Sequence, residues 1–167
     1  VVLVDSPVRP PDYDWENRPR TAPIRPKKTY PDRDAAIARF RLRPPQECAN
    51  AYILKYIAEH SIHEVDGGWE WKFDDKLLET FKRGSMSNDL AGIPCRTAVI
   101  LGEESKLFTQ DIADYMFKVL DRSVPFITIP EAEHHIWLDQ PLAFISCLRT
   151  LLAEWRHSRP QRGDRHL

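Results

Sequence analysis

Three short apolar runs in this chain each end in side chains that can do acid–base chemistry. The first run is followed by Asp5, the second by Glu103 and Glu104, and the third by His134 and His135. Ligands of open parallel sheets bind at the carboxyl ends of the strands, so these side chains are expected to lie close together. A carboxylate beside a histidine makes up two thirds of a nucleophile–histidine–acid triad. In such a triad the histidine removes a proton from the nucleophile, and the carboxylate fixes the histidine's tautomer.

The runs themselves indicate an α/β fold with a mostly parallel sheet. The chain opens on four apolar, mainly β-branched residues, a pattern typical of a strand buried on both faces of such a sheet. Because such a strand has no partner before it in the sequence, we expect the chain to be a piece of a longer protein. Two more strands are predicted at residues 97–101 and 125–130, and amphipathic helices at residues 109–120 and 141–155. Strand, helix, strand and helix joined by short connections are typical of βαβ units.

The region between the first two strands differs sharply in composition. Nine of the fourteen prolines fall within residues 7–45, and proline excludes both a central strand and a long helix there. We interpret residues 8–93 as a lid over the sheet. Its predicted elements are helices at residues 32–40, 44–60 and 75–82, an extended segment at residues 67–74, and a linker at residues 84–92.

The sequence around the two histidines resembles the C-terminal signature of the α/β-hydrolase family. In that signature a histidine follows the last strand and precedes an acidic-x-Pro helix start, as His134 does here, seven residues before Pro141. The opening VVLVDSP resembles the strand before the family's cap, VILGEES resembles the next core strand with its acid loop, and GWEWKFD is similar to a cap motif of esterase-like members. The resemblance implies the C-terminal part of an α/β-hydrolase fold with a helical cap insertion. Its expected parts are a core strand in residues 1–7, a cap in 8–93, a βαβα part of the core in 94–157 and a flexible tail in 158–167.

Two departures from the family pattern matter. The nucleophile elbow, G-x-S-x-G, occurs nowhere in the chain, so we expect the nucleophile to lie outside it and the chain alone to be inactive. The usual acid position, three residues after the strand-ending glycine, is Ser105, so the triad acid is either the displaced Glu104 or Glu103, or Asp5 after the earlier strand, with Asp5 and Glu104 equally favoured. Each carboxylate also has a structural interpretation, as a loop cap for Asp5 and as a solvated loop group for Glu104.

The resemblance gives His134 the role of general base, with His135 as the second choice. Trp69 and Trp71 alternate with polar residues, a period typical of a half-buried extended segment. These tryptophans are expected either to line a substrate pocket under the lid, with His135 as a further substrate-binding candidate, or to pack in the lid's own core.

The resulting expectation is an ester hydrolase acting on a small molecule. The alternatives are a haloalkane dehalogenase or epoxide hydrolase with an aspartate nucleophile, and a non-catalytic hydrolase-like binding protein, which Ser105 favours and His134 opposes. With a net charge of -1 and no long apolar run, neither nucleic acid nor a membrane is indicated as a partner. The three widely spaced cysteines form no zinc or disulfide pattern, so we expect no cofactor and a cytoplasmic location.

Overall fold

Three apolar runs form one parallel sheet. Its strands are β1 (Val2–Val4), β4 (Ala98–Gly102) and β5 (Phe126–Ile129), in the order β1-β4-β5. Val4 pairs with Ile100, and Ile100 pairs in turn with Ile127, so the carboxyl ends of all three strands meet at one edge. β-Branched side chains such as these pack well on a pleated surface. The three predicted strands and the predicted α/β fold with a mostly parallel sheet are therefore confirmed.

The computed structural model describes residues 1–14, 26–77, 86–120 and 124–158. Residues 78–82 of the predicted helix at 75–82 lie outside these ranges, as does the predicted tail at 158–167 apart from Ser158. Within the described ranges, no helix is both long enough and apolar enough to cross a membrane.

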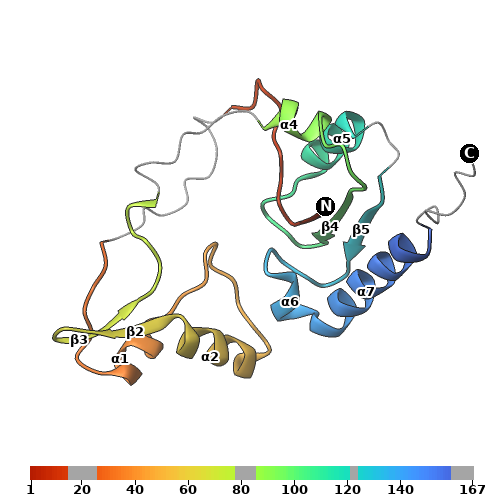
Figure 1. The fold of residues 1–167 in the computed structure, drawn as a ribbon. Helices are drawn as coiled ribbons and strands as arrows, with labels where there is room; N and C mark the ends of the chain where they lie inside the picture. The colour runs from red at the N-terminus through yellow and green to blue at the C-terminus, as the bar shows by residue number, and fades with distance from the viewer. Residues whose placement is uncertain (15–25, 78–85, 121–123, 159–167) are drawn as a thin grey trace, which may run out of the picture.

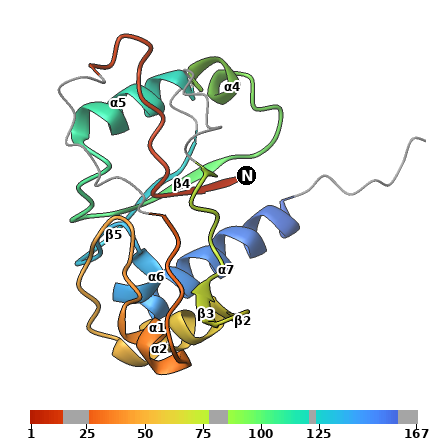
Figure 2. The same ribbon diagram turned by 90° about the vertical axis from the view of Figure 1, so that its left-hand side faces the viewer.

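Helices cover both faces of the sheet, as the two views in Figures 1 and 2 show. Because side chains alternate along a strand, Val99 faces one layer and packs with Ile112, whereas Ile100 faces the other and packs with Ile136. The first layer contains α4 (Ser87–Ala91) and α5 (Gln110–Val119), and the second contains α6 (Ile136–Asp139) and α7 (Pro141–His157). The predicted helices at 109–120 and 141–155 are confirmed, whereas α6 was not predicted.

Helix α4 lies in the segment that the sequence predicts to be a linker. That prediction is wrong, because Leu90 is 3% exposed and belongs to the same core cluster as Ile112. The few apolar side chains of this short polar stretch give no periodic signal, and Leu90 is buried by distant parts of the chain, including Val99 and helix α5.

A second group of elements, which we call the cap, packs beside the carboxyl edge of the sheet (Figure 1). Asp32 begins its first helix, where the Asp32 carboxylate accepts from the Ala35 N–H at 2.8 Å. Gly67, with a φ of 88°, makes the hairpin turn that a residue with a Cβ disfavours. The cap consists of α1 (Arg33–Ala38), α2 (Ala51–His60), and the antiparallel strands β2 (Ile62–Val65) and β3 (Gly68–Trp71). The extended segment around β3 was predicted, but its partner β2 was not.

The chain before α2 is extended rather than helical. The sequence predicts a helix from Pro44, yet α2 begins at Ala51. Along residues 44–50 the even-numbered residues are half-buried and the odd-numbered ones exposed, which is the period of a strand. Gln46 and Asn50 form hydrogen bonds with Asp139 and Leu138, so tertiary contacts decide the backbone here. The Pro-Pro pair that suggested a helix start therefore belongs to an extended strap.

Candidate active site

Asp5 is a buried carboxylate at the carboxyl end of β1. The residue is 1% exposed, and its φ of 42° lies in the left-handed region that residues other than glycine rarely adopt. Its N–H still donates to the Ile100 carbonyl oxygen at 2.8 Å, so strand pairing continues up to this turn. The side chain reaches across to β4, where the Gly102 N–H donates to Oδ1 of Asp5 at 3.2 Å.

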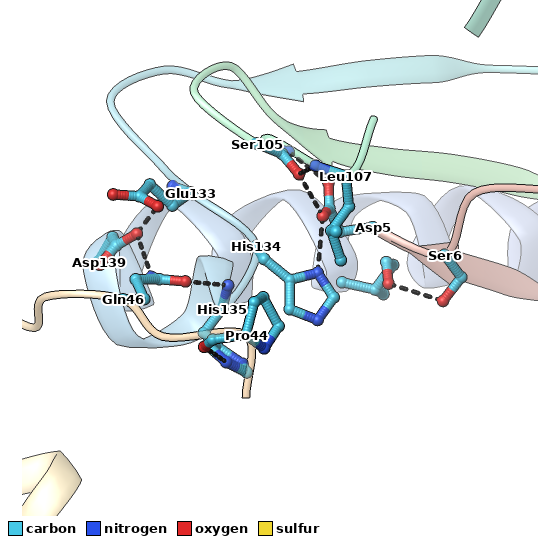
Figure 3. A network of polar contacts seen from close by, with 12 residues as sticks. Asp5, Ser6, Pro44, Gln46, Ser105, Leu107, Glu133, His134, His135 and Asp139 are labelled. Atoms are coloured by element: carbon cyan, nitrogen blue, oxygen red, sulfur yellow. Dashed lines mark hydrogen bonds and ion pairs between the residues drawn. The ribbon is translucent and has the colours of Figure 1, made fainter. Parts of the chain in front are cut away.

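The Asp5 carboxylate meets His134, which lies on the loop after β5. The Nδ1 atom of His134 is 2.8 Å from Oδ2 of Asp5, and Figure 3 shows the opposite edge of the ring turned away from that carboxylate. Because a carboxylate accepts hydrogen bonds, Nδ1 carries the proton and Nε2 carries the lone pair. In the part of the chain that the structure describes, no side chain is hydrogen-bonded to Nε2. The Asp5 side chain is 0% exposed and that of His134 is 24% exposed, so the histidine is open to a reacting group while its acid is shielded from water.

Ser105 completes the surroundings of Asp5. Its hydroxyl donates to Oδ2 of Asp5 at 2.6 Å and accepts from the Leu107 N–H at 3.3 Å. With Gly102 and His134, three donors therefore surround one carboxylate. The sequence identified Ser105 only as a departure from the usual acid position; in the fold it holds the carboxylate that comes from the neighbouring strand.

The other two acidic candidates point elsewhere. Glu103 accepts from the Glu131 N–H at 3.1 Å. Glu104 is exposed, and its N–H donates to the Ala132 carbonyl oxygen at 2.9 Å. The structure thus brings Asp5 to His134 and does not bring Glu104 there.

His135 points in a different direction from His134 and contacts the strap of residues 44–50. It is 9% exposed, its N–H donates to Oε1 of Gln46 at 2.8 Å, and its Nε2 is 3.3 Å from the Pro44 carbonyl oxygen. Burial lowers the pKa of His135, the positive charge of a protonated His134 lowers it further, and the Pro44 carbonyl acts in the opposite direction. A buried, largely neutral imidazole at this place joins the cap to the loop that carries His134.

Trp71 lies in the cap's own core. Its indole N–H donates to the Ala36 carbonyl oxygen at 3.1 Å. The centroid of its ring lies 6.2 Å from that of Tyr30, 6.0 Å from that of Phe40 and 5.8 Å from that of Phe73. Trp69 is half-buried on the same strand, with its backbone paired to Tyr30. The described contacts of Trp71 are those of cap packing, and the substrate-binding role of the two tryptophans stays a prediction.

The described residues offer no group of three or more histidine, cysteine or acidic side chains that could hold a metal ion. A half-open cavity of about 390 Å³ lies near Thr97 and Pro125, at the amino ends of β4 and β5. That is the end of the sheet opposite to His134, so the cavity does not include the Asp5–His134 pair.

Neither the comparison with protein-family models nor the comparison with curated proteins finds a match to this sequence. Solved structures do match it. A thioesterase domain from the curacin biosynthetic pathway is 16% identical with a TM-score of 0.62, over 89% of this chain and 56% of that one. E-2-(acetamidomethylene)succinate hydrolase is 18% identical with a TM-score of 0.64, over 76% of this chain and 47% of that one.

A peroxisomal α/β-hydrolase from Saccharomyces cerevisiae is 18% identical with a TM-score of 0.55, over 70% of this chain and 34% of its own. At these identities the likeness concerns the fold. The chain spans about half the length of the first two structures. This chain therefore has part of the α/β-hydrolase fold.

Proposed function

We propose that this chain supplies the histidine and the acid of an ester hydrolase acting on a small molecule, and that the nucleophile lies outside the chain. The observation that carries the proposal is the contact of 2.8 Å between Nδ1 of His134 and Oδ2 of Asp5, with the Nε2 edge left open. A histidine held by a buried carboxylate and open on its other side has the geometry of a general base.

In the proposed reaction, Nε2 of His134 takes the proton of the nucleophilic hydroxyl as its oxygen attacks the ester carbonyl. The resulting imidazolium is stabilised by the Asp5 carboxylate at Nδ1. The same Nε2 then gives the proton to the departing alkoxide, which leaves an acyl-enzyme. A water molecule, deprotonated by Nε2, hydrolyses that ester, and the returned proton regenerates the nucleophile.

Asp5 is preferred over Glu104 as the acid because of its surroundings. Asp5 is buried and accepts from three donors, one of them on His134, whereas Glu104 is exposed on its loop. A buried carboxylate held in place stabilises the positive charge of an imidazolium more strongly than a solvated carboxylate does, because water screens the electrostatic interaction. Ser105 at the family's usual acid position is consistent with this choice, because its hydroxyl supports the carboxylate rather than replacing it.

Two further observations support hydrolysis. Two of the similar structures are, by name, a thioesterase domain and a hydrolase, which is consistent with acyl-group chemistry on this fold. The absence of G-x-S-x-G from the sequence is consistent with a nucleophile supplied by another part of a longer protein.

The test uses the full-length protein with short-chain p-nitrophenyl esters. We expect His134→Ala to lower kcat by about 10⁴-fold or more, because it removes the base. His63→Ala, at an exposed histidine on β2, is the matched control and is expected to leave kcat unchanged. Residues 1–167 alone are expected to be inactive. Full activity in His134→Ala, or esterase activity of residues 1–167 alone, would contradict the proposal. Activity toward haloalkanes or epoxides in place of esters would instead indicate an aspartate nucleophile.

A further inference from the structure

The strap of residues 44–50 runs along the loop that carries His134. Its half-buried, even-numbered residues all contact residues 135–139, which is the pattern of an extended chain with one face against a partner. These contacts come from Pro44 to His135, from Gln46 to His135 and Asp139, from Cys48 to Leu138, and from Asn50 to Leu138 and Asp139.

Gln46 is the residue of the strap whose side chain bonds to the backbone next to His134 and to Asp139. Its Oε1 accepts from the His135 N–H at 2.8 Å, and its Nε2 donates to Oδ2 of Asp139 at 2.7 Å. The same Oδ2 of Asp139 accepts from the Glu133 N–H at 2.8 Å. Figure 3 shows this chain of contacts beside the imidazole. The two backbone amides that flank His134 are therefore both held by the Gln46–Asp139 side-chain pair.

We propose that Gln46, in the strap that leads into helix α2 of the cap, is a positioning residue for His134, an inference that rests on the proposed function. Gln46 fixes the loop on both sides of the histidine, and so keeps Nδ1 at hydrogen-bond distance from Asp5. A displacement of the order of 1 Å in a catalytic group is enough to cost about 100-fold in rate. The cap thus contributes to the chemistry through the strap, without contact between Gln46 and the reacting atoms.

The chemistry of the position explains why a primary amide serves there. The group must accept from a backbone N–H and at the same time donate to a carboxylate, and among acyclic side chains of this length only glutamine does both at neutral pH. Glutamate retains the acceptor but places a second negative charge against Asp139. Methionine has nearly the same length and makes neither hydrogen bond, without adding charge.

The test compares Gln46→Glu and Gln46→Met with Gln110→Glu in the full-length protein. Gln110 is a matched control, because its Nε2 also donates to a carboxylate, that of Asp114 at 2.8 Å, but on the exposed side of α5. Two quantities are measured: kcat and KM for a p-nitrophenyl ester, and the NMR signal of the His134 Nδ1 proton with its exchange rate, assigned by its loss in His134→Ala.

Both Gln46 variants are expected to lower kcat by about 10- to 100-fold with KM within about twofold, and to weaken the His134 proton signal through faster exchange. Gln110→Glu is expected to change neither quantity. If one Gln46 variant does not fold, the other decides the question. Unchanged kcat and an unchanged proton signal in a folded Gln46 variant would overturn the inference.

Failure of the proposed function is distinguished by other results. If His134→Ala keeps its activity, the histidine is not the base, and the proposed function falls. The proton signal then decides the inference alone. Its loss in Gln46→Met and retention in Gln110→Glu supports positioning by Gln46, and its retention in both refutes it.

Discussion

Asp5→Asn tests the acid with the least disturbance to the fold. Asparagine has the same shape as aspartate and adopts the left-handed backbone region more readily than most residues, so the φ of 42° at this position can be kept. Alanine would add backbone strain to the chemical change. The substitution therefore isolates the loss of the carboxylate from the loss of the turn.

The size of the expected effect of Asp5→Asn on kcat follows from the three donors that surround the Asp5 side chain. An amide has one oxygen and one NH₂ group. If the oxygen stays on the Gly102 N–H, the NH₂ group meets Ser105 and His134, and the imidazole must present an unprotonated Nδ1. The opposite orientation sets the NH₂ group against the Gly102 N–H and leaves buried donors unpaired, at a cost of about 1–3 kcal/mol. The first orientation therefore prevails.

In that orientation the ring proton moves to Nε2, the atom that must accept the proton of the nucleophile. The expected loss in kcat is about 10⁴-fold, or roughly 5 kcal/mol in the barrier. The assay is p-nitrophenyl ester hydrolysis by the full-length protein, with thermal unfolding as the check on folding. Glu104→Gln is the matched control and is expected to retain full activity, because Glu104 is exposed and away from His134. Near-normal activity in Asp5→Asn together with its loss in Glu104→Gln would refute the assignment of the acid.

Two further predictions concern stability. A Cβ on Gly102 would overlap the backbone carbonyl oxygens of Ala132 and Glu133, so Gly102→Ala is expected to lower the free energy of unfolding by about 3 kcal/mol in urea. A Cβ on Gly92 would make only one tight contact, with α4, so Gly92→Ala is expected to lower the free energy of unfolding clearly less. Equal losses in the two variants would argue against the close approach of Gly102 to residues 132 and 133. The pKa of His135 is lower in the folded protein than in the unfolded chain, so the unfolded chain takes up a proton first as the pH falls. The free energy of unfolding therefore has its full value above about pH 6.5 and decreases as the pH falls from there through the folded pKa. His135→Asn is expected to flatten this dependence in denaturation curves between about pH 7 and 5, and an unchanged slope would contradict it.

The sequence was sufficient to predict the parallel sheet and the edge at which Asp5 and His134 meet. Short runs of β-branched residues bounded by proline or glycine are typical of buried strands, and parallel strands bring their carboxyl ends together. Asp5 could be proposed on this ground because it directly follows the first run, and His134 because it lies on the short loop after the third. Thr109 and Pro141 likewise marked two helix starts that the structure contains.

What the sequence left open depended on contacts between distant segments. Asp5 and Glu104 are both carboxylates after strands, and only the left-handed turn at Asp5 directs one of them to Ser105 and His134. The sequence does not predict the left-handed turn at Asp5, since aspartate is usually found in other backbone conformations.

The cap shows the same division between local pattern and tertiary contact. The alternation around Trp71 predicted an extended segment, but its place against α1 and Tyr30 came from packing. The two prolines before Gln46 favoured a helix, and an extended strap formed because its side chains bind the loop about 90 residues later in the chain. The preference of a residue for a helix amounts to a few tenths of a kcal/mol. A single hydrogen bond contributes about 1 kcal/mol, so a few tertiary hydrogen bonds outweigh that preference. The sequence by itself therefore determined the sheet and the edge at which the candidate side chains gather, and the tertiary structure decided which acid meets the histidine and what holds it there.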